Sequence, residues 1–186
     1  MAEDSRYYHT LYEVARTINS SLDSTRVLEK ITSEVTRAMN AKAASIRLLG
    51  RQRQRLLLGA AHGLSRGYLR KGPIDVEKSG IDREVIETGE PVSTNSCTVN
   101  RLQYPGEAAR EGIKSIMVVP LKVADNVIGV IRVYDEECRE YALHEVQFLQ
   151  AVADLSALAI ENARLHEALK TDYELLAAWE SRLFED

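Results

Sequence analysis

The hydrophobic pattern at the start of the chain predicts two amphipathic helices. Within residues 7–22, apolar side chains recur three or four positions apart, which is the period of a helix with one buried face. The same period returns over residues 25–39, where Asp23 or Ser24 offers a side-chain oxygen to cap the first exposed N–H groups. The apolar positions are Leu11, Val14, Ile18, Val27, Leu28, Ile31, Val35 and Met39.

The pattern then changes to a period of two, which is typical of half-buried strands. Two pairs of such segments stand far apart in the chain, and each pair encloses a short polar stretch that suits a hairpin turn. The predicted strands are residues 44–49 and 56–61, joined by 50–55, and residues 116–121 and 127–134, joined by a turn over 124–126. In the last of these, Gly129 suits a place where a neighbouring backbone packs closely.

Alternation along these strands places polar side chains on one face of the predicted sheet. Ile46 faces the terminal helices, so Ser45, Arg47 and Arg132 are expected to project from the opposite face. Two guanidinium groups on one wall favour a carboxylate or phosphate ligand, which each guanidinium can bind through two parallel hydrogen bonds. The alternative is that both arginines pair with nearby acidic groups or lie on a solvated face.

Between the two hairpins the sequence is punctuated by glycine and has no sustained period. Residues 81–88 predict a short helix that ends at Gly89, and residues 92–94 a short strand. Residues 95–110 show little strand pattern, which suits a lid over a ligand. From this stretch Arg101 and Tyr104 are expected to close over the two arginines.

Residues 142–184 form one long helical pattern without an internal proline or glycine. A broad apolar stripe at its start narrows into a seam with spacings of three and four, which is the heptad pattern of paired helices. The seam residues are Leu155, Leu158, Asn162, Leu165, Leu169 and Leu176. Asn162 and Asp172 interrupt it, and a polar Asn in such a seam fixes register and strand number. We therefore expect a homodimer, the alternative being one helix that lies on its own domain.

Composition and charge narrow the classes of partner. The 186 residues are 45% hydrophobic and 28% charged, as in a globular protein, and the net charge of −4 argues against nucleic acid. No signal peptide is visible and no apolar run reaches the roughly 18 residues of a spanning helix, so we expect no membrane. Cys97 and Cys138 are far apart and lack a CxxC partner, which favours a cytoplasmic location with free thiols and no metal.

Several short motifs, in this order along the chain, resemble those of the GAF domain family. They are GEPV at 89–92, GIKS at 112–115, VVPL at 118–121, IGVI at 128–131 and ALAIENARL at 157–165. The resemblance implies an α+β, sandwich-like fold with a central antiparallel sheet of five or six strands. The N- and C-terminal helices would cover one face, and pocket loops and short helices the other. It also implies three parts: an N-terminal helix at 1–22, the sensory domain at 23–165, and a helical extension at 166–186.

The resemblance further implies a non-catalytic sensor, in which an unknown small ligand acts on paired terminal helices and through them on a downstream kinase or regulator. The cofactor remains open, since the chain lacks the family's cyclic-nucleotide signature, the cysteine setting of covalent bilins and a convincing haem ligand. One alternative is an interaction module with no ligand. A more distant one is a methionine sulfoxide reductase, which requires an attacking thiolate with a resolving thiol in reach, and Cys97 and Cys138 are its only candidates.

Overall fold

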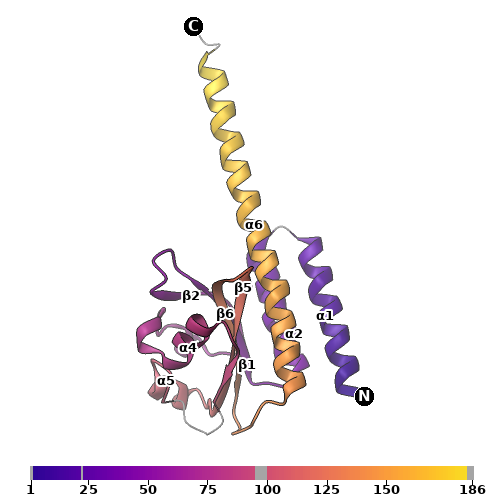
Figure 1. The fold of residues 1–186 in the computed structure, drawn as a ribbon, viewed down its shortest axis with the longest axis vertical. Helices are drawn as coiled ribbons and strands as arrows, with labels where there is room; N and C mark the ends of the chain where they lie inside the picture. Colours follow the sequence, from indigo (N-terminus) through magenta and orange to yellow (C-terminus); the bar gives the residue numbers. More distant parts are fainter. Residues whose placement is uncertain (1, 22, 95–99, 184–186) are drawn as a thin grey trace.

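The computed structural model describes residues 2–21, 23–94 and 100–183, except for the side chains of residues 2–4, 177, 178 and 180–183. A sheet in the middle of the molecule separates long helices on one side from short helices on the other (Figure 1). The elements in chain order are α1 (Ala2–Ser20), α2 (Ser24–Ala38), β1 (Ala43–Leu49), β2 (Arg55–His62), α3 (Arg66–Leu69), β3 (Ile74–Asp75), a 3₁₀ turn η1 (Val76–Lys78), α4 (Gly80–Thr88), β4 (Val92–Ser93), α5 (Pro105–Arg110), β5 (Ser115–Val123), β6 (Asn126–Asp135) and α6 (Leu143–Leu183).

The sheet has six strands in the order β3-β2-β1-β6-β5-β4, and every neighbouring pair is antiparallel. The two predicted hairpins, β1–β2 and β5–β6, meet at the centre, where β1 pairs with β6. This arrangement confirms the expected α+β fold with a central antiparallel sheet. The two-residue strands β3 and β4 complete the edges, and β3 escapes sequence analysis because two residues carry no measurable period.

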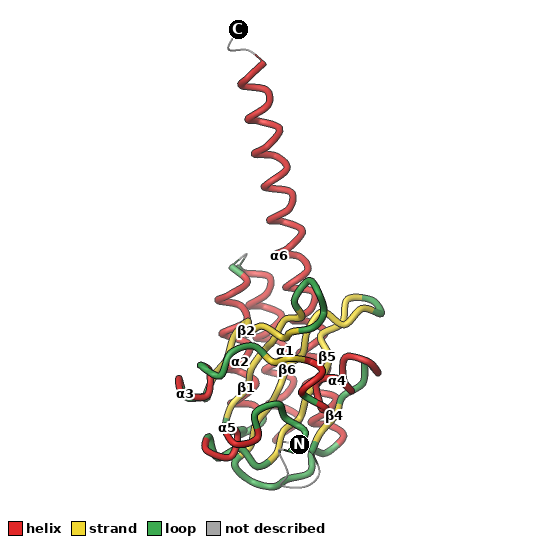
Figure 2. Tube along the Cα trace, turned by 90° about the vertical axis from the view of Figure 1, so that its left-hand side faces the viewer, coloured by secondary structure: helices red, strands yellow, loops and turns green. Residues whose placement is uncertain are grey.

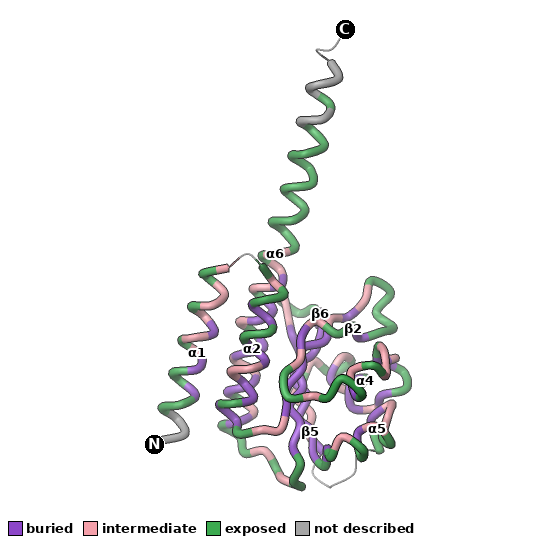
Figure 3. Tube along the Cα trace, turned by 180° about the vertical axis from the view of Figure 1, so that it is seen from behind, coloured by how far each residue is buried: buried purple, intermediate pink, exposed green. Residues whose placement is uncertain are grey.

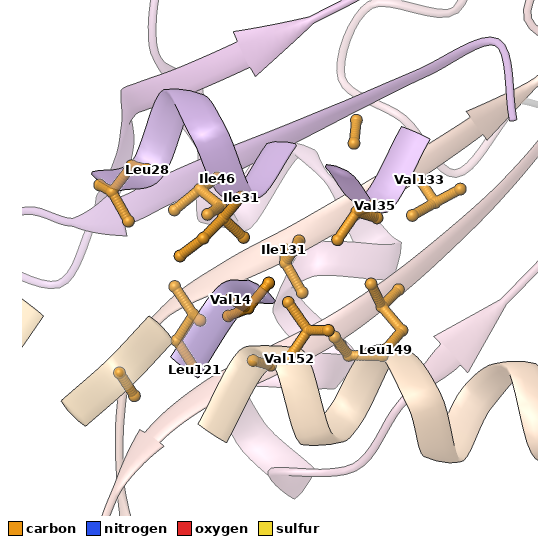
Figure 4. Packing of buried hydrophobic residues seen from close by; sticks show 14 of the residues in the cluster. Val14, Leu28, Ile31, Val35, Ile46, Leu121, Ile131, Val133, Leu149 and Val152 are labelled. Carbon is orange, nitrogen blue, oxygen red and sulfur yellow. The ribbon is translucent and has the colours of Figure 1, made fainter. Parts of the chain in front are cut away.

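Helices α2 and α6 cover one face of the sheet, and α1 packs against both of them from outside (Figures 1 and 3). The core under these helices is largely aliphatic, with side chains from the sheet and from the helices interdigitating (Figure 4). Helix α2 begins where Asp23 accepts hydrogen bonds from the backbone N–H groups of Thr25 and Arg26. Between Asp23 and Ser24, the two candidates for the cap, the structure therefore selects Asp23.

Gly129 is required where β6 passes β1. A Cβ atom at this position would lie 2.3 Å from the carbonyl oxygen of Arg47, far inside contact distance. The close approach that the sequence predicted at Gly129 therefore joins the two central strands directly beside Arg47.

A second hydrophobic core lies on the other face, between the sheet and the short helices α3, α4 and α5 (Figure 2). Leu56, Tyr68, Ile81, Val118 and Tyr134 belong to it. Strict alternation along β6, counted from Val130 and Arg132, would also place Ile128 on this face, which is not where it lies. The β5–β6 register shifts between Leu121 and Lys122, so Ile128 turns into the core under the helices.

The C-terminal part of α6 leaves the body of the molecule and projects away from it (Figures 1 and 3). Its N-terminal part lies on the sheet, with Leu149, Val152, Ala157 and Ile160 buried. Beyond Ala163 every described side chain of α6 is exposed. Across the described ranges, no helix combines the length and apolarity that crossing a bilayer requires.

Candidate functional site

Three charged side chains lie together, completely buried, on the sheet face that α4 covers. Arg47 on β1 and Arg132 on β6 are each 1% exposed, and Asp82 in the first turn of α4 is 0% exposed. The sheet sets this arrangement, because Ser45 pairs directly with Arg132 and Arg47 points to the same face two residues further along. We call Arg47, Arg132 and Asp82 the arginine cluster.

Asp82 is the protein's own counter-ion within the cluster. Its Oδ2 lies 3.4 Å from Nη2 of Arg132 and accepts a hydrogen bond from the hydroxyl of Ser79. Burial by itself lowers the pKa of Arg132, but Asp82, Tyr134 and Tyr68 together raise it above its ordinary value, so this guanidinium stays charged. Among the described residues, Nε and Nη1 of Arg132 and Oδ1 of Asp82 find no hydrogen-bond partner.

Arg47 is less satisfied than Arg132. Its Nε, Nη1 and Nη2 atoms are all buried, and within the described ranges none of them has a hydrogen-bond partner. Burying a charge without a partner costs several kcal/mol, so buried guanidinium groups are normally paired with an anion. The cluster thus holds one internal carboxylate for two guanidinium groups and is short of negative charge.

Two tyrosines form the wall beside the cluster. The Tyr134 hydroxyl is 2.9 Å from Oγ of Ser45, and the guanidinium carbon of Arg132 lies 5.5 Å from the centre of the Tyr134 ring. The Tyr68 ring, on α3, meets Tyr134 edge-on at 6.2 Å between centroids. Burial and the neighbouring Tyr134 raise the pKa of Tyr68, and its buried hydroxyl has no hydrogen-bond partner in the described structure. Both rings therefore present polar hydroxyl groups within an otherwise apolar wall.

Lys71 follows α3 and lies over the outer side of Tyr68, with Nζ 3.3 Å from the ring centroid. Contact with an aromatic face favours a charged ammonium group. Burial and the positive charges of Arg132 and Arg47 act in the opposite direction, and they lower the pKa of Lys71 to about 6. At pH 7 Lys71 is therefore mostly neutral and adds little to the positive charge of the cluster.

This lowered pKa predicts a pH dependence of stability. Between about pH 6 and 10.5 the unfolded chain holds a proton on Lys71 that the folded protein does not, so the free energy of unfolding increases with pH. From pH 6.5 to 9 we expect a gain of about 1–2 kcal/mol from this residue, after allowing for its partial exposure to solvent.

Urea unfolding at several pH values in this range measures the effect. The matched variant Lys71→Met keeps the side-chain length and removes the titration, so its curve should lack this part of the increase. Equal slopes for the two proteins would show that Lys71 titrates normally in the folded state.

The structure brings three of the five predicted ligand residues together: Ser45, Arg47 and Arg132. Arg101 lies on the surface, where it pairs with Glu84 and donates a hydrogen bond to the carbonyl of Gly80. It therefore anchors the segment before α5 to α4 and does not reach the arginine cluster.

Tyr104 lies at the edge of the site. Its hydroxyl donates a hydrogen bond to the carbonyl of Pro73, and its ring centre is 5.5 Å from Nζ of Lys71. It thus belongs to the surface layer outside Tyr68, with Lys71 between it and the cluster wall.

Sequence reasoning missed Asp82, Tyr68 and Lys71. Asp82 carried a usable signal, because it lies beside Ile81 and three residues before Val85, on the buried stripe of α4. An acidic residue on such a stripe calls for a buried cationic partner. Tyr68 and Lys71 carried none, since α3 is only four residues long and shows no period.

A surface cavity of about 270 Å³ between α3 and α5 reaches the Tyr68 ring. Its lining also includes Ser65, Gly67 and Glu111, and Glu111 accepts hydrogen bonds from the backbone N–H and hydroxyl of Ser65. Another cavity lies between α1, α2 and α6, with mostly apolar walls and a few amide and hydroxyl groups. Of the two, the first includes Tyr68 from the wall beside the arginine cluster, and neither is lined by Arg47, Arg132 or Asp82.

The described part of the chain contains Cys138 and several side chains of the types that bind metals. No group of three or more His, Cys, Asp or Glu side chains there is placed to hold a metal ion. The expectation of free thiols is wrong for Cys138, which is disulfide-bonded, because separation along the chain does not report which sulfur lies nearby in space. Cys97 lies outside the described residues.

The seam residues of α6 point to solvent in the single chain. Leu158, Leu165, Leu169 and Leu176 are each more than half exposed, and Trp179 extends the same line. Leu155 at the start is partly buried against the core. The described protein therefore leaves most of an apolar helix face uncovered.

Comparison with known proteins gives a consistent result. The family model described as "GAF domain" matches residues 21–161. The chain is 28% identical over 170 residues to a Nif-specific regulatory protein of Azospirillum brasilense, covering 86% of the chain and 26% of that protein. It is 25% identical over 173 residues to the protein of the same name from Herbaspirillum seropedicae, covering 90% of the chain and 31% of that protein. The chain thus spans about a quarter to a third of these curated relatives.

Solved structures share the fold at low sequence identity. The GAF domain of an Acinetobacter phosphoenolpyruvate-protein phosphotransferase superposes with a TM-score of 0.70 at 22% identity, covering 85% of this chain and 94% of that one. The free methionine-R-sulfoxide reductase of Neisseria meningitidis gives a TM-score of 0.72 at 16% identity, covering 86% and 91%. Since the family model covers most of the chain and the fold agrees, this chain belongs to the GAF domain family.

Proposed function

We propose that the chain is the non-catalytic sensory module of a cytoplasmic regulatory protein, and that it binds a small anion in the arginine cluster. The observation that carries this proposal is the set of unpaired, buried guanidinium nitrogens, three on Arg47 and two on Arg132. A bound anion supplies the acceptors that these donors lack and neutralises charge that the protein otherwise buries at a cost.

The relatives support a regulatory role. The curated proteins that match are regulatory proteins by name, and the chain corresponds to only part of their length. A module of this kind reports ligand occupancy to other parts of a larger protein or to a partner such as a kinase or regulator. Specificity for a given output is a property of those other parts.

A reductase is the weaker candidate for this site. Reduction of a sulfoxide by thiols requires an attacking thiolate and a second thiol that resolves the intermediate. The described residues of the arginine cluster and its tyrosine wall include no cysteine, and Cys138 lies in the turn between β6 and α6. The buried guanidinium nitrogens without partners support anion binding in the cluster instead.

Isothermal calorimetry with a panel of carboxylates and phosphates tests the proposal. We expect at least one anion to bind the unaltered protein, and Arg47→Met to weaken that binding at least 100-fold, because a buried bidentate charge pair is lost. Arg51→Met, at an exposed arginine in the β1–β2 turn, is the matched control and should bind normally. Binding that survives Arg47→Met unchanged would refute the arginine cluster as the site.

We also propose that the output passes through a homodimer held by α6. The exposed seam leucines supply the interface, and burying each one contributes about 1.5–3 kcal/mol. The double variant Leu165→Asp/Leu169→Asp should therefore weaken association at least about 1,000-fold, since both copies lose both contacts.

Sedimentation velocity over a range of concentrations measures this association. A control double variant, Lys170→Asp/Thr171→Asp, changes exposed residues of the same helix outside the seam and should remain dimeric. A chain that ends after Leu165 is expected to behave like the seam variant. A monomeric unaltered protein at all concentrations would exclude the seam as a dimer interface, whereas a dimer that binds no anion would favour an interaction module without a ligand.

A further inference from the structure

The arginine cluster holds an unsatisfied acceptor as well as unsatisfied donors. Oδ1 of Asp82 is fully buried and has no hydrogen-bond partner in the described part of the chain, while Oδ2 is already used by Arg132 and Ser79. The Tyr68 hydroxyl, on the same side of the sheet, is also without a partner there. A carboxylate alone satisfies the arginines but offers nothing to Oδ1, because both groups are acceptors.

Charge gives a second, independent constraint. Arg47 and Arg132 contribute two positive charges and Asp82 one negative charge, so the cluster carries a net charge of +1. Lys71 lies outside the cluster, over the ring of Tyr68. A ligand of net charge −1 neutralises the cluster, and it must bring enough acceptors for five guanidinium nitrogens, three on Arg47 and two on Arg132.

We propose that the ligand is an acidic amino acid, an α-amino acid with a second carboxylate on its side chain. Its two carboxylates bind Arg47 and Arg132, and its ammonium group donates to Oδ1 of Asp82. This inference rests on the proposed anion-binding function and deepens it by naming the ligand class.

Other small anions fit less well. A dicarboxylate without an amine carries a charge of −2 and places acceptors against Oδ1 of Asp82. Inorganic phosphate at pH 7.5 is mostly the dianion, which exceeds the charge of the cluster and brings a hydroxyl donor in place of an ammonium group. An amino acid with a neutral side chain has no net charge and leaves one guanidinium without an anion. Of the ligands compared, the acidic amino acid is the one that brings two separate carboxylates, a charged donor for Oδ1 and a net charge of −1.

Calorimetric titration of the unaltered protein at pH 7.5 tests the inference with ligands that differ by one group. L-Glutamate and glutarate differ only by the amine, and so do L-aspartate and succinate. L-Glutamine carries a neutral amide in place of the side-chain carboxylate of glutamate. We expect one acidic amino acid to bind about 10- to 100-fold more tightly than its amine-free counterpart, the range that one charge-assisted hydrogen bond contributes. L-Glutamine and inorganic phosphate should bind at least 10-fold more weakly than that amino acid.

The variant Asp82→Asn tests the acceptor in the proposed hydrogen bond between the ligand's ammonium group and Asp82. It should remove the preference for the amine, so that the amino acid and its amine-free counterpart bind within a few-fold of each other. Glu87→Gln, on the exposed face of α4, is the control and should keep the preference. Because Asp82 also holds Arg132, circular dichroism checks the fold of the variant, and the ligand series on the unaltered protein decides without it.

The outcomes separate this inference from the function on which it rests. If glutarate, succinate or phosphate binds as tightly as the acidic amino acids, and Arg47→Met abolishes that binding, the amino-acid inference fails while the anion-binding function stands. If no anion in the panel binds in a way that depends on Arg47, both fail.

Discussion

Replacement of Asp82 by alanine is expected to lower the free energy of unfolding by about 3–5 kcal/mol, the usual cost of removing one partner from a buried ion pair. The carboxylate is 0% exposed and lies 3.4 Å from Arg132. Without it, two guanidinium groups stay buried in one cluster with no counter-ion from the protein. Ser79, whose hydroxyl donates to the same carboxylate, loses its acceptor as well.

Chemical denaturation at pH 7.5 without added anions measures this loss, which corresponds to a decrease of roughly 6–20 °C in Tm for a chain of this size. Glu87→Ala, at an exposed acidic residue of the same helix, should change the free energy of unfolding by less than about 0.5 kcal/mol.

A double variant identifies the cause of the loss. Asp82→Ala combined with Arg132→Met should be clearly less destabilised than the sum of the single variants, because the uncompensated charge is removed together with its partner. Strict additivity, or a loss below 1 kcal/mol for Asp82→Ala alone, would mean that Asp82 does not act as the counter-ion.

Most of the fold follows from periodicity in the sequence. The helix-period runs at the start of the chain became α1 and α2, and the strand-period runs became β1, β2, β5 and β6. Turn residues in the sequence mark where each hairpin reverses. Gly129 marks where β6 of one hairpin packs closely against β1 of the other. The elements that escaped, α3, β3 and η1, are four, two and three residues long. At such lengths tertiary contacts determine the structure and no pattern exists to read.

The site was predictable only where it lies on regular elements. Ser45, Arg47 and Arg132 share a face because strands alternate, and alternation is visible in the sequence. Predicting the position of Asp82 requires the knowledge that α4 packs over β6. Predicting Tyr68 and Lys71 requires the path of an irregular segment. For Arg101 the prediction was wrong: its place in a lid-like stretch of the sequence suggested a ligand contact, but its side chain pairs with Glu84 on the surface. Side chains on irregular segments are positioned by long-range packing that one sequence does not reveal.

The arginine cluster makes opposite demands on stability and function. A buried charge without a partner destabilises the folded state, whereas the same unpaired donors provide affinity for an anion. Proteins retain such groups at functional sites and offset their cost elsewhere, here through the two hydrophobic cores on either side of the sheet. Removing the charge should therefore separate the two effects.

Arg47→Met is expected to stabilise the protein by about 1–4 kcal/mol when no anion is present, the gain seen when well-packed apolar side chains replace buried charges. Methionine matches the length of the arginine stem and adapts to the surrounding shape, so little cavity is created. The side chain is 1% exposed, and within the described residues its three guanidinium nitrogens have no hydrogen-bond partners, so the substitution removes no protein contact of that kind.

Denaturation curves of Arg47→Met and of the control Arg51→Met, each with and without a saturating anion, measure the prediction. The unaltered protein should gain stability with the anion, because a ligand that binds only the folded state shifts the equilibrium toward it. Arg47→Met should begin more stable and gain nothing, whereas Arg51→Met should follow the unaltered protein. A destabilised Arg47→Met protein would instead show that Arg47 makes interactions that support the fold. Its guanidinium group would then no longer indicate a ligand site.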